Sequence, residues 1–487
     1  MRVEVTGQQL GEIGADLEAL ALFDGEELPD ALRSVAGAND VRAAFRKLTL
    51  LRPDGDRRVL VVGLGKRDEL GVERLRVAAA LALAEAGRYD ASALAWELPD
   101  GPRKDANADL AAALVEGTVL ASFRFDRFKS RDPDDPPPAR LDRLVIAAGD
   151  EAGEVARPVE VARIASEAAN RARELQALPS NVITPSRLAD RALEIADAHD
   201  AVSAEVLGPA EIRDRGMGGL AAVAKGSVEE PRLIVLRYEP AEAAGETLGL
   251  VGKAVTFDTG GISIKPAAKM EEMKMDMSGG AAVLEAVEAI AELGLPVRIV
   301  ACVPATENMP GGSATKPGDI ITQLNGKTVE VNNTDAEGRL ILADALTYCV
   351  RELGADRVVD IATLTGGVVV ALGSTYAGLI SNDDDWAERV RSAAEHTGEL
   401  AWRLPLHPEY KDLTRGSDAD LTNVSAKRKA SSIYAGSFLE EFVDAKPWVH
   451  LDIAGTAWDV GRAYVGNGPT GYGVRLFVAL AGGLAES

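Results

Sequence analysis

The apolar residues of this chain fall into short runs rich in Val, Ile and Leu, separated by longer segments in which apolar residues recur at helical spacing. Beyond about residue 230 the runs are Leu233–Leu236, Leu248–Val251, Val297–Val303, Val358–Ile361 and Val449–Ile453. Such alternation is typical of an open, mostly parallel sheet whose faces are covered by helices. Ligands of these sheets bind beyond the carboxyl ends of the strands. The pattern therefore predicts an α/β fold with its site in the loops that follow the runs.

Residues 1 to about 148 repeat this alternation on a smaller scale. Apolar runs such as Val59–Val62 and Leu144–Ala148 lie among Ala- and Leu-rich stretches, which predicts a smaller α/β domain. The proline-rich, charged segment Lys129–Asp142 cannot continue a helix or a central strand, so we interpret it as a surface loop. Pro158–Leu175 has helical spacing and predicts a connecting helix.

The length of 487 residues exceeds what one hydrophobic core usually holds, which favours two domains. We expect an N-terminal α/β domain over residues 1–157, a connecting helix over 158–178 and a larger domain over 179–487. The N-terminus lacks the basic start and apolar run of a secretory signal, and the apolar stretches are shorter than the roughly 20 residues that cross a bilayer. These features predict a cytoplasmic protein that does not enter a membrane.

The charge and cysteine content narrow the classes of partner. A net charge of −23 repels nucleic acid phosphates and anionic lipids, so a small or cationic-ended ligand fits the chain better. The two cysteines, Cys302 and Cys349, each lie in an apolar segment. They indicate buried thiols in a reducing compartment and exclude a disulfide framework.

Candidate chemistry lies in polar clusters that follow the apolar runs. The clusters supply four carboxylates and two lysines: Asp258, Asp276, Asp335, Glu337, Lys253 and Lys265. Carboxylate oxygens suit Mg²⁺ and Mn²⁺, also bind Zn²⁺, and can bridge two ions. The four histidines lack the paired helical spacing of a histidine zinc site. One such acid alone would ordinarily be a helix cap or a surface charge, but the whole set favours a pair of metal ions.

The local pattern suggests how these groups converge. In an extended loop the side chains at i and i+2 point the same way, so Asp335 and Glu337 can face one ion while Ala336 faces elsewhere. Gly260–Gly261 and Gly279–Gly280 follow two of the acids and permit tight backbone geometry. A lysine beside two divalent ions can coordinate after losing its proton or stabilise an oxyanion as an ammonium. The residues alone leave both roles open.

Several motifs are those of one known family. They are LVGKAVTFDTGGISIKP (Leu250–Pro266), MEEMKMDMSGGAAV (Met270–Val283), VPATENMP (Val303–Pro310), NTDAEGRLILADAL (Asn333–Leu346), DIATLTG (Asp360–Gly366), HLDIAGTAW (His450–Trp458) and TGYGVRL (Thr470–Leu476). FRFDRFKS (Phe123–Ser130) extends the match to the N-terminal part. The chain resembles the leucyl aminopeptidase family of dinuclear-metal exopeptidases, whose signature is NTDAEGRL.

The resemblance implies an enzyme that removes N-terminal amino acids, leucine and similar residues, from peptides through a water activated by two Mn²⁺, Zn²⁺ or Mg²⁺ ions. The free α-amino group of the peptide would bind one ion. The implied metal ligands are Lys253, Asp258, Asp276, Asp335 and Glu337, with Asp258 and Glu337 shared by both ions.

Two further sets of residues follow from the same resemblance. Lys265 would stabilise the tetrahedral oxyanion, and Arg339 would hold a bicarbonate that shuttles a proton. The implied substrate-binding residues are Met273, Asn333, Thr363, Leu364 and Gly366.

The resemblance also implies a particular architecture. It comprises a C-terminal catalytic domain with a central mixed, mostly parallel sheet flanked by helices, a smaller N-terminal macro-like α/β domain, and a homohexamer. The segment Asn423–Gly436 departs from the family, which usually has a glycine-rich loop there, and it carries three basic residues, Lys427–Lys429. The departure leaves the shape of the substrate pocket and the preferred N-terminal residue open.

Three alternatives compete with the peptidase interpretation. A DNA-binding architectural role, in addition to or instead of peptidase activity, has a local contact in Lys427–Lys429, but the overall acidity opposes it. A two-metal phosphoesterase would use a similar metal pair, but the chain lacks a phosphate-binding GxxxxGK[ST] loop. An inactive family member is disfavoured because the implied metal ligands are all present.

Overall fold

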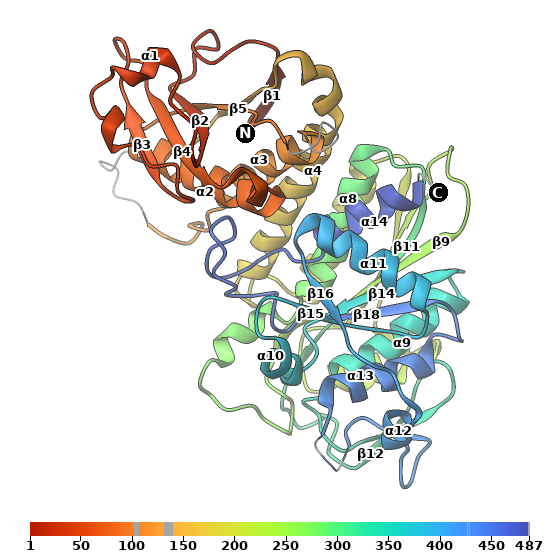
Figure 1. The fold of residues 1–487 in the computed structure, drawn as a ribbon. Helices are drawn as coiled ribbons and strands as arrows, with labels where there is room; N and C mark the ends of the chain where they lie inside the picture. Colours follow the sequence, from red (N-terminus) through yellow and green to blue (C-terminus); the bar gives the residue numbers. More distant parts are fainter. Residues whose placement is uncertain (102–106, 131–139, 426, 428, 486–487) are drawn as a thin grey trace. The chain divides into compact units, whose positions relative to one another are not determined.

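Strands and helices alternate along the chain in the computed structural model, which describes residues 1–101, 107–130, 140–425, 427 and 429–485. They form two compact units, Met1–Glu167 with Gly461–Gly466, and Ala168–Val460 with Asn467–Ser487 (Figure 1). The boundary falls within the long helix α4 (Ala152–Ala177). In the segment interpreted as a surface loop, residues 131–139 lie outside the described residues.

The first unit is built on a six-stranded sheet in the order β1-β6-β5-β2-β4-β3, parallel except for the edge strand β3. Its strands are β1 (Arg2–Thr6), β2 (Leu17–Phe23), β3 (Leu48–Leu51), β4 (Val59–Gly65), β5 (Ala93–Glu97) and β6 (Arg143–Ala147). Its other helices are α1 (Asp30–Arg33), α2 (Val72–Arg88) and α3 (Asn107–Ala121). Helices α2 and α3 pack closely because Gly117 has no side chain: a Cβ there would lie 2.3 Å from the carbonyl oxygen of Arg76.

The second unit contains a nine-stranded mixed sheet in the order β16-β15-β18-β14-β9-β11-β8-β7, with β10 paired to β11. Its strands are β7 (Val202–Leu207), β8 (Arg232–Tyr238), β9 (Thr247–Gly252), β10 (Ala254–Asp258), β11 (Arg298–Asn308), β14 (Arg357–Ala362), β15 (Ala377–Ser381), β16 (Ala401–Arg403) and β18 (Trp448–Asp452). Strands β18, β14, β9 and β11 run parallel, whereas β15, β8 and β7 join by antiparallel pairs. The predicted fold class, a mixed and mostly parallel sheet with a smaller α/β unit before it, is confirmed.

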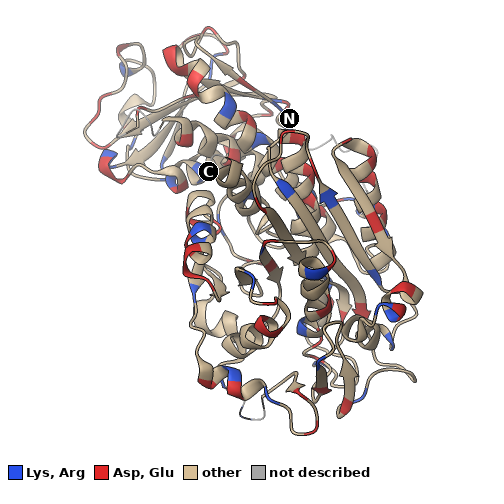
Figure 2. Ribbon diagram, turned by 90° about the vertical axis from the view of Figure 1, so that its right-hand side faces the viewer, with Lys and Arg blue, Asp and Glu red and all other residues tan. Residues whose placement is uncertain are grey.

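Helices cover both faces of this sheet. They are α5 (Pro185–Ala198), α6 (Pro209–Asp214), α7 (Gly218–Ala224), α8 (Ser278–Leu293), α9 (Gly338–Arg351), α10 (Gly366–Leu372), α11 (Asp384–Thr397), α12 (Pro408–Lys411), α13 (Ser431–Leu439) and α14 (Val474–Ala485). Helices α8, α11 and α14 pack in one group, and α7, α9 and α13 in another, while α8 and α9 both contact β9 and β11. The central strands are therefore buried along almost their whole length, and in Figure 2 they carry few charged positions compared with the surrounding helices and loops.

A small sheet adds to one side of this scaffold. It consists of β12 (Asp319–Thr322), β13 (Thr328–Val331) and β17 (Leu421–Thr422), in that order. Strand β17 pairs in parallel with β13 and so holds the chain near residue 422 against the segment that leads into α9. Among the described helices, none is both long and apolar enough to span a membrane.

Asp344 lies inside α9 and connects three elements. Its side chain is 1% exposed, and it accepts hydrogen bonds from the backbone N–H groups of Leu220 in α7, at 2.9 Å, and Leu324 in the β12–β13 turn, at 2.8 Å. Burial raises the pKa of Asp344 from 3.8 to about 7, against the opposing effect of these hydrogen bonds. Between pH 4 and 7 the carboxyl group of Asp344 is therefore protonated to a greater extent in the folded chain than in the unfolded chain.

This difference makes stability depend on pH. Between pH 4 and 7 the folded state binds more protons at Asp344 than the unfolded state, so its contribution to the free energy of unfolding falls as pH rises, by at most about 1.4 kcal/mol per pH unit, and levels off above pH 7. We expect Asp344→Asn to remove this component, which urea denaturation of both proteins at several pH values would measure. Parallel pH profiles for the two proteins would contradict the prediction.

Candidate metal centre

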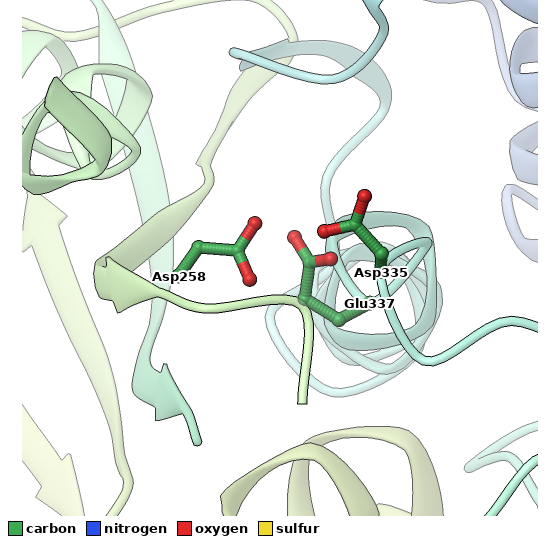
Figure 3. Close-up of side chains that lie close together, drawn as sticks. All are labelled: Asp258, Asp335 and Glu337. Carbon is green, nitrogen blue, oxygen red and sulfur yellow. The ribbon is translucent and has the colours of Figure 1, made fainter. Parts of the chain in front are cut away.

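Three carboxylates converge at the carboxyl end of the central strands. Asp258 is the last residue of β10, Asp335 lies in a turn and Glu337 immediately precedes α9. One oxygen from each lies within 4.8 Å of the others, and Figure 3 shows the three carboxylates directed toward one another. The arrangement is one that can hold a metal ion through oxygen ligands.

The turn that carries Asp335 differs from the extended loop that we expected. Residues Thr334 and Asp335 form a turn, Asn333 Oδ1 accepts a hydrogen bond from Asp335 N at 3.0 Å, and Glu337 already has the helical dihedral angles φ −75° and ψ −36°. The expectation of alternating side chains was therefore wrong. The two carboxylates approach each other because a tight turn runs directly into a helix, where side-chain direction no longer alternates.

Lys253 joins Asp276 to this group. It follows β9, is 2% exposed, and its Nζ lies 2.7 Å from Asp276 Oδ2 and 2.8 Å from Glu337 Oε1. Its ammonium also donates to the carbonyl oxygen of Thr363 at 3.0 Å, and Thr363 Oγ1 donates to Asp276 Oδ1 at 2.7 Å. Asp276 stands just before α8, so loops from three places in the chain meet at one lysine.

Lys265 makes a similar connection on the other side of the group. Its Nζ lies 2.8 Å from Asp258 Oδ2 and 2.5 Å from Asp335 Oδ1, and its side chain is 21% exposed. The loop from β10 reaches this position through Gly260 and Gly261, whose φ angles of 86° and 68° favour glycine. A Cβ on Gly260 would also lie 2.9 Å from Asp335 Oδ1. The first glycine pair therefore has the role that the sequence predicts.

The second glycine pair has a different role. Gly279 and Gly280 lie in the first turn of α8, and their φ angles are not positive. A Cβ on Gly279 would lie 2.1 Å from the carbonyl oxygen of Ile361 in β14. The glycines let the start of α8, and with it Asp276, approach the sheet closely. Close packing, not a tight turn, explains this pair.

The charges of the cluster are only partly balanced. Burial lowers the pKa of Lys253, but the nearby carboxylates, Asp276 first, outweigh it, so this pKa lies above its ordinary value. Burial raises the pKa of Asp276 to about 8 although Lys253 opposes the shift, and burial also raises the pKa of Asp335 and of Glu337. Four acids share two ammonium groups, which favours additional positive charge at this place.

The donor set itself fits divalent metal ions. Glu337 Oε2 is buried and accepts no hydrogen bond from the described residues. Asp276 Oδ2 and Asp335 Oδ1 accept no hydrogen bond of good geometry within the part of the chain that the structure describes, although a lysine ammonium lies near each. Buried carboxylate oxygens without donors are expensive unless a cation lies beside them. All five residues predicted as metal ligands are thus brought together, and Lys265 lies among them.

Arg339 lies in the first turn of α9, two residues after Glu337. Its side chain contacts the segment that contains Asn423 and Tyr434. It is 6% exposed, donates through Nη1 to the carbonyl oxygen of Asn423 at 2.8 Å, and lies over the ring of Tyr434 at 5.5 Å from its centre. Burial lowers the pKa of Arg339. Its Nε has no hydrogen-bond partner among the described residues, so the guanidinium retains a free donor for an anion.

The residues predicted to bind substrate surround this group to different degrees. Thr363 touches Asp276, and Asn333 shapes the Asp335 turn. Leu364 lies near Lys253, since a Cβ on Gly338 would lie 2.9 Å from both Leu364 Cδ1 and Lys253 Nζ. Met273 is half-buried in a short 3₁₀ helix, and its carbonyl oxygen accepts a hydrogen bond from Asp276 N at 3.2 Å, whereas Gly366 is exposed at the start of α10.

Two buried asparagines at the site were given no role from the sequence. Asn308, at the end of β11, donates to Asp258 Oδ1 at 2.8 Å and to the carbonyl oxygen of Thr334 at 3.0 Å. Asn423 contacts the segment before α9. The first lies in the quoted motif Val303–Pro310, which was the available signal. The second begins the departing segment Asn423–Gly436, in which residues 426 and 428 lie outside the described residues and Ser431 already starts α13.

Known proteins resemble this chain over almost its full length. Residues 170–478 match the model of the cytosol aminopeptidase family catalytic domain, and residues 14–132 match that of its N-terminal domain. Proteins named "Probable cytosol aminopeptidase" from Roseiflexus castenholzii and Solibacter usitatus are each 45% identical to this chain, covering 98% and 99% of both chains, respectively. The solved structure of the bottromycin maturation enzyme BotP in complex with Mn is 36% identical, with a TM-score of 0.87, covering 97% of this chain and 100% of that one. The chain therefore belongs to the cytosol aminopeptidase family of metal-dependent peptidases.

Proposed function

We propose that this enzyme uses two divalent metal ions to hydrolyse the first peptide bond of short peptides, with leucine and similar residues preferred at the N-terminus. The observation that carries the proposal is the buried group of four carboxylates around two lysines. The residues that would hold the ions are Lys253, Asp258, Asp276, Asp335 and Glu337. When bound, such ions polarise a carbonyl group and lower the pKa of water.

Lys265 is suited to act on the substrate itself. It is more exposed than Lys253, and the carboxylates around it, Asp258 first after burial, raise its pKa above the ordinary value, so it stays an ammonium at neutral pH. A fixed ammonium beside the carbonyl group would stabilise the negative charge that develops on its oxygen. Lys253, by contrast, is enclosed by Asp276 and Glu337 among the residues that would hold the ions, and as a metal ligand it would have to lose its proton.

Arg339 is suited to bind a small anion near the reaction. Its buried Nε, which has no hydrogen-bond partner among the described residues, supports the proposed bicarbonate site, in which the anion would carry a proton between water and the leaving amine. Leucine preference would depend on the surroundings of Leu364 and Met273, which offer apolar surface beside the cluster. The identity of the ions, the cytoplasmic location, the homohexamer and the macro-like N-terminal domain stay predictions. No observation favours a DNA-binding role.

Peptidase activity should depend on metal and on a free N-terminus. We expect metal-stripped protein to lose release of leucine from leucine p-nitroanilide and from Leu-Gly, and to regain it with Mn²⁺, Zn²⁺ or Mg²⁺. N-acetylated leucine p-nitroanilide should not be cleaved.

Two substitutions in the cluster should impair this activity. Lys265→Ala should lower kcat by roughly 100- to 1,000-fold, as loss of an oxyanion-stabilising group does. Asp335→Ala should abolish metal-restored activity.

The matched control is Lys316→Ala, because Lys316 is an exposed lysine of the same unit that pairs with Asp319. It should retain wild-type kcat. Absence of turnover on every N-terminal residue tested, with two ions bound per chain, would contradict the proposal, as would equal cleavage of the acetylated substrate.

A side chain at Gly338 should disturb the metal site. A Cβ at this position would lie 2.8 Å from Lys253 Cε and 2.9 Å from Leu364 Cδ1, so the methyl group of Gly338→Ala must displace one of them. We expect this variant to bind Mn²⁺ roughly 10- to 100-fold more weakly, as for other changes beside metal ligands, measured by competition with a chelating dye. Gly312→Ala, where a Cβ would meet nothing within 4 Å, is the control, and equal affinities for both variants would exclude this steric role.

A further inference from the structure

We propose that Asn423 is the positioning residue that holds Asp335 and Glu337 in the geometry needed for metal binding. The inference rests on the proposed two-metal function and adds a residue outside the ligand set. Asn423 follows β17, some ninety residues beyond the carboxylates in sequence, and its side chain is completely buried.

The side-chain amide of Asn423 is saturated by one segment. Its Oδ1 accepts from the backbone N–H groups of Asn332, at 2.9 Å, and Asn333, at 3.3 Å. Its Nδ2 donates to the carbonyl oxygens of Asn333, at 2.6 Å, and Ala336, at 3.3 Å. An asparagine amide has two donor hydrogens and two acceptor positions, so all of its capacity is used between residues 332 and 336. These neighbours also determine the orientation of the amide, since N–H groups face its oxygen and carbonyl groups face its nitrogen.

The backbone of Asn423 makes two further hydrogen bonds, one on each side of residues 332–336. Its N–H donates to the carbonyl oxygen of Glu330, at 3.0 Å, and its own carbonyl oxygen accepts from Arg339 Nη1, at 2.8 Å. The residue therefore spans the stretch from the end of β13 to the first turn of α9. Asp335 and Glu337 both lie inside this stretch, and Asn423 itself contacts neither carboxylate.

This position is one where a rigid support is needed. Hydrogen bonds from Asn308 and to Gly260 hold Thr334 in the turn before α9, but Asp335 beside it is one of the more exposed residues of this turn. A carboxylate ligand must be held within a fraction of an ångström of its working position, which depends on the hydrogen bonds behind it. Asn423 supplies hydrogen bonds of this kind from the neighbouring segment of the same chain. The parallel pairing of β17 with β13 in turn fixes the position of Asn423.

Two variants separate positioning from electrostatics. Asn423→Asp keeps the size of the side chain and its acceptor oxygen. It replaces the NH₂ group that donates to the carbonyl oxygens of Asn333 and Ala336 by a second acceptor oxygen, and it adds a negative charge. Asn423→Leu removes all four side-chain hydrogen bonds and adds no charge. If Asn423 positions the carboxylates, both variants should bind Mn²⁺ roughly 10- to 100-fold more weakly. The d–d absorption bands of Co²⁺ bound in place of the native ions should shift, and kcat should fall more than KM changes.

The matched control is Asn325→Asp. Asn325 also ties the β12–β13 region to the C-terminal chain, by donating to the carbonyl oxygen of Glu441 at 3.1 Å, but it lies in the turn between these strands. It should leave affinity, cobalt spectrum and kcat unchanged. Thermal unfolding of each variant shows that the measurement is made on folded protein, and Asn423→Asp decides the question if Asn423→Leu does not fold.

The outcomes distinguish this inference from the function on which it rests. Tighter Mn²⁺ binding by Asn423→Asp would overturn positioning in favour of a purely electrostatic effect. Wild-type affinity and an unaltered cobalt spectrum in folded Asn423→Asp would overturn it as well, while leaving the two-metal function intact. Wild-type protein that binds no divalent ion would overturn the proposed function and this inference together.

Discussion

Lys253 is almost completely buried, and its ammonium is held by Asp276 and Glu337 at 2.7 and 2.8 Å. A buried charge of this kind is tolerated only when its partners are fixed around it. Much of the catalytic unit serves this requirement. Gly279 and Gly280 let α8 bring Asp276 against the sheet, Gly338 leaves space for the lysine side chain, and Thr363 both accepts from the lysine and donates to Asp276.

The parallel sheet explains why such distant segments meet. Strands β9, β11 and β14 are adjacent and run in the same direction, so the residues that follow β9 and β14 emerge at one edge, together with the end of β10, which pairs in parallel with β11. Helices α8 and α9 begin at the same edge and bring the residues before them, Asp276 and Glu337. Buried, continuously apolar strands make this edge rigid, which the charged group requires.

The supporting residues around the cluster are neutral amides and hydroxyl groups. Asn308 and Asn423 hold the two loops that carry Asp258, Asp335 and Glu337, and Thr363 holds Asp276. Neutral groups can satisfy backbone and carboxylate atoms without changing the charge available to metal ions. The charged residues of the cluster thus face one another, while Asn308 and Thr363 bind carboxylate oxygens and Asn423 binds the backbone of the turn.

Much of the architecture could be predicted from the sequence because it depends on local patterns. Runs such as Leu248–Val251 and Val358–Ile361 are mostly apolar, and the structure has β9 and β14 there. The candidate residues could be named as well, because acids and lysines gather after those runs.

The local sequence pattern could not reveal how these groups face one another. The turn at Asp335, the packing role of Gly279–Gly280 and the contacts of Asn423 all depend on segments up to a hundred residues away. The sequence by itself thus determined the elements and the chemical groups, through short-range periodicity and residue type. Only the tertiary structure decided which groups share a buried site, because that depends on strand order and on contacts between distant segments.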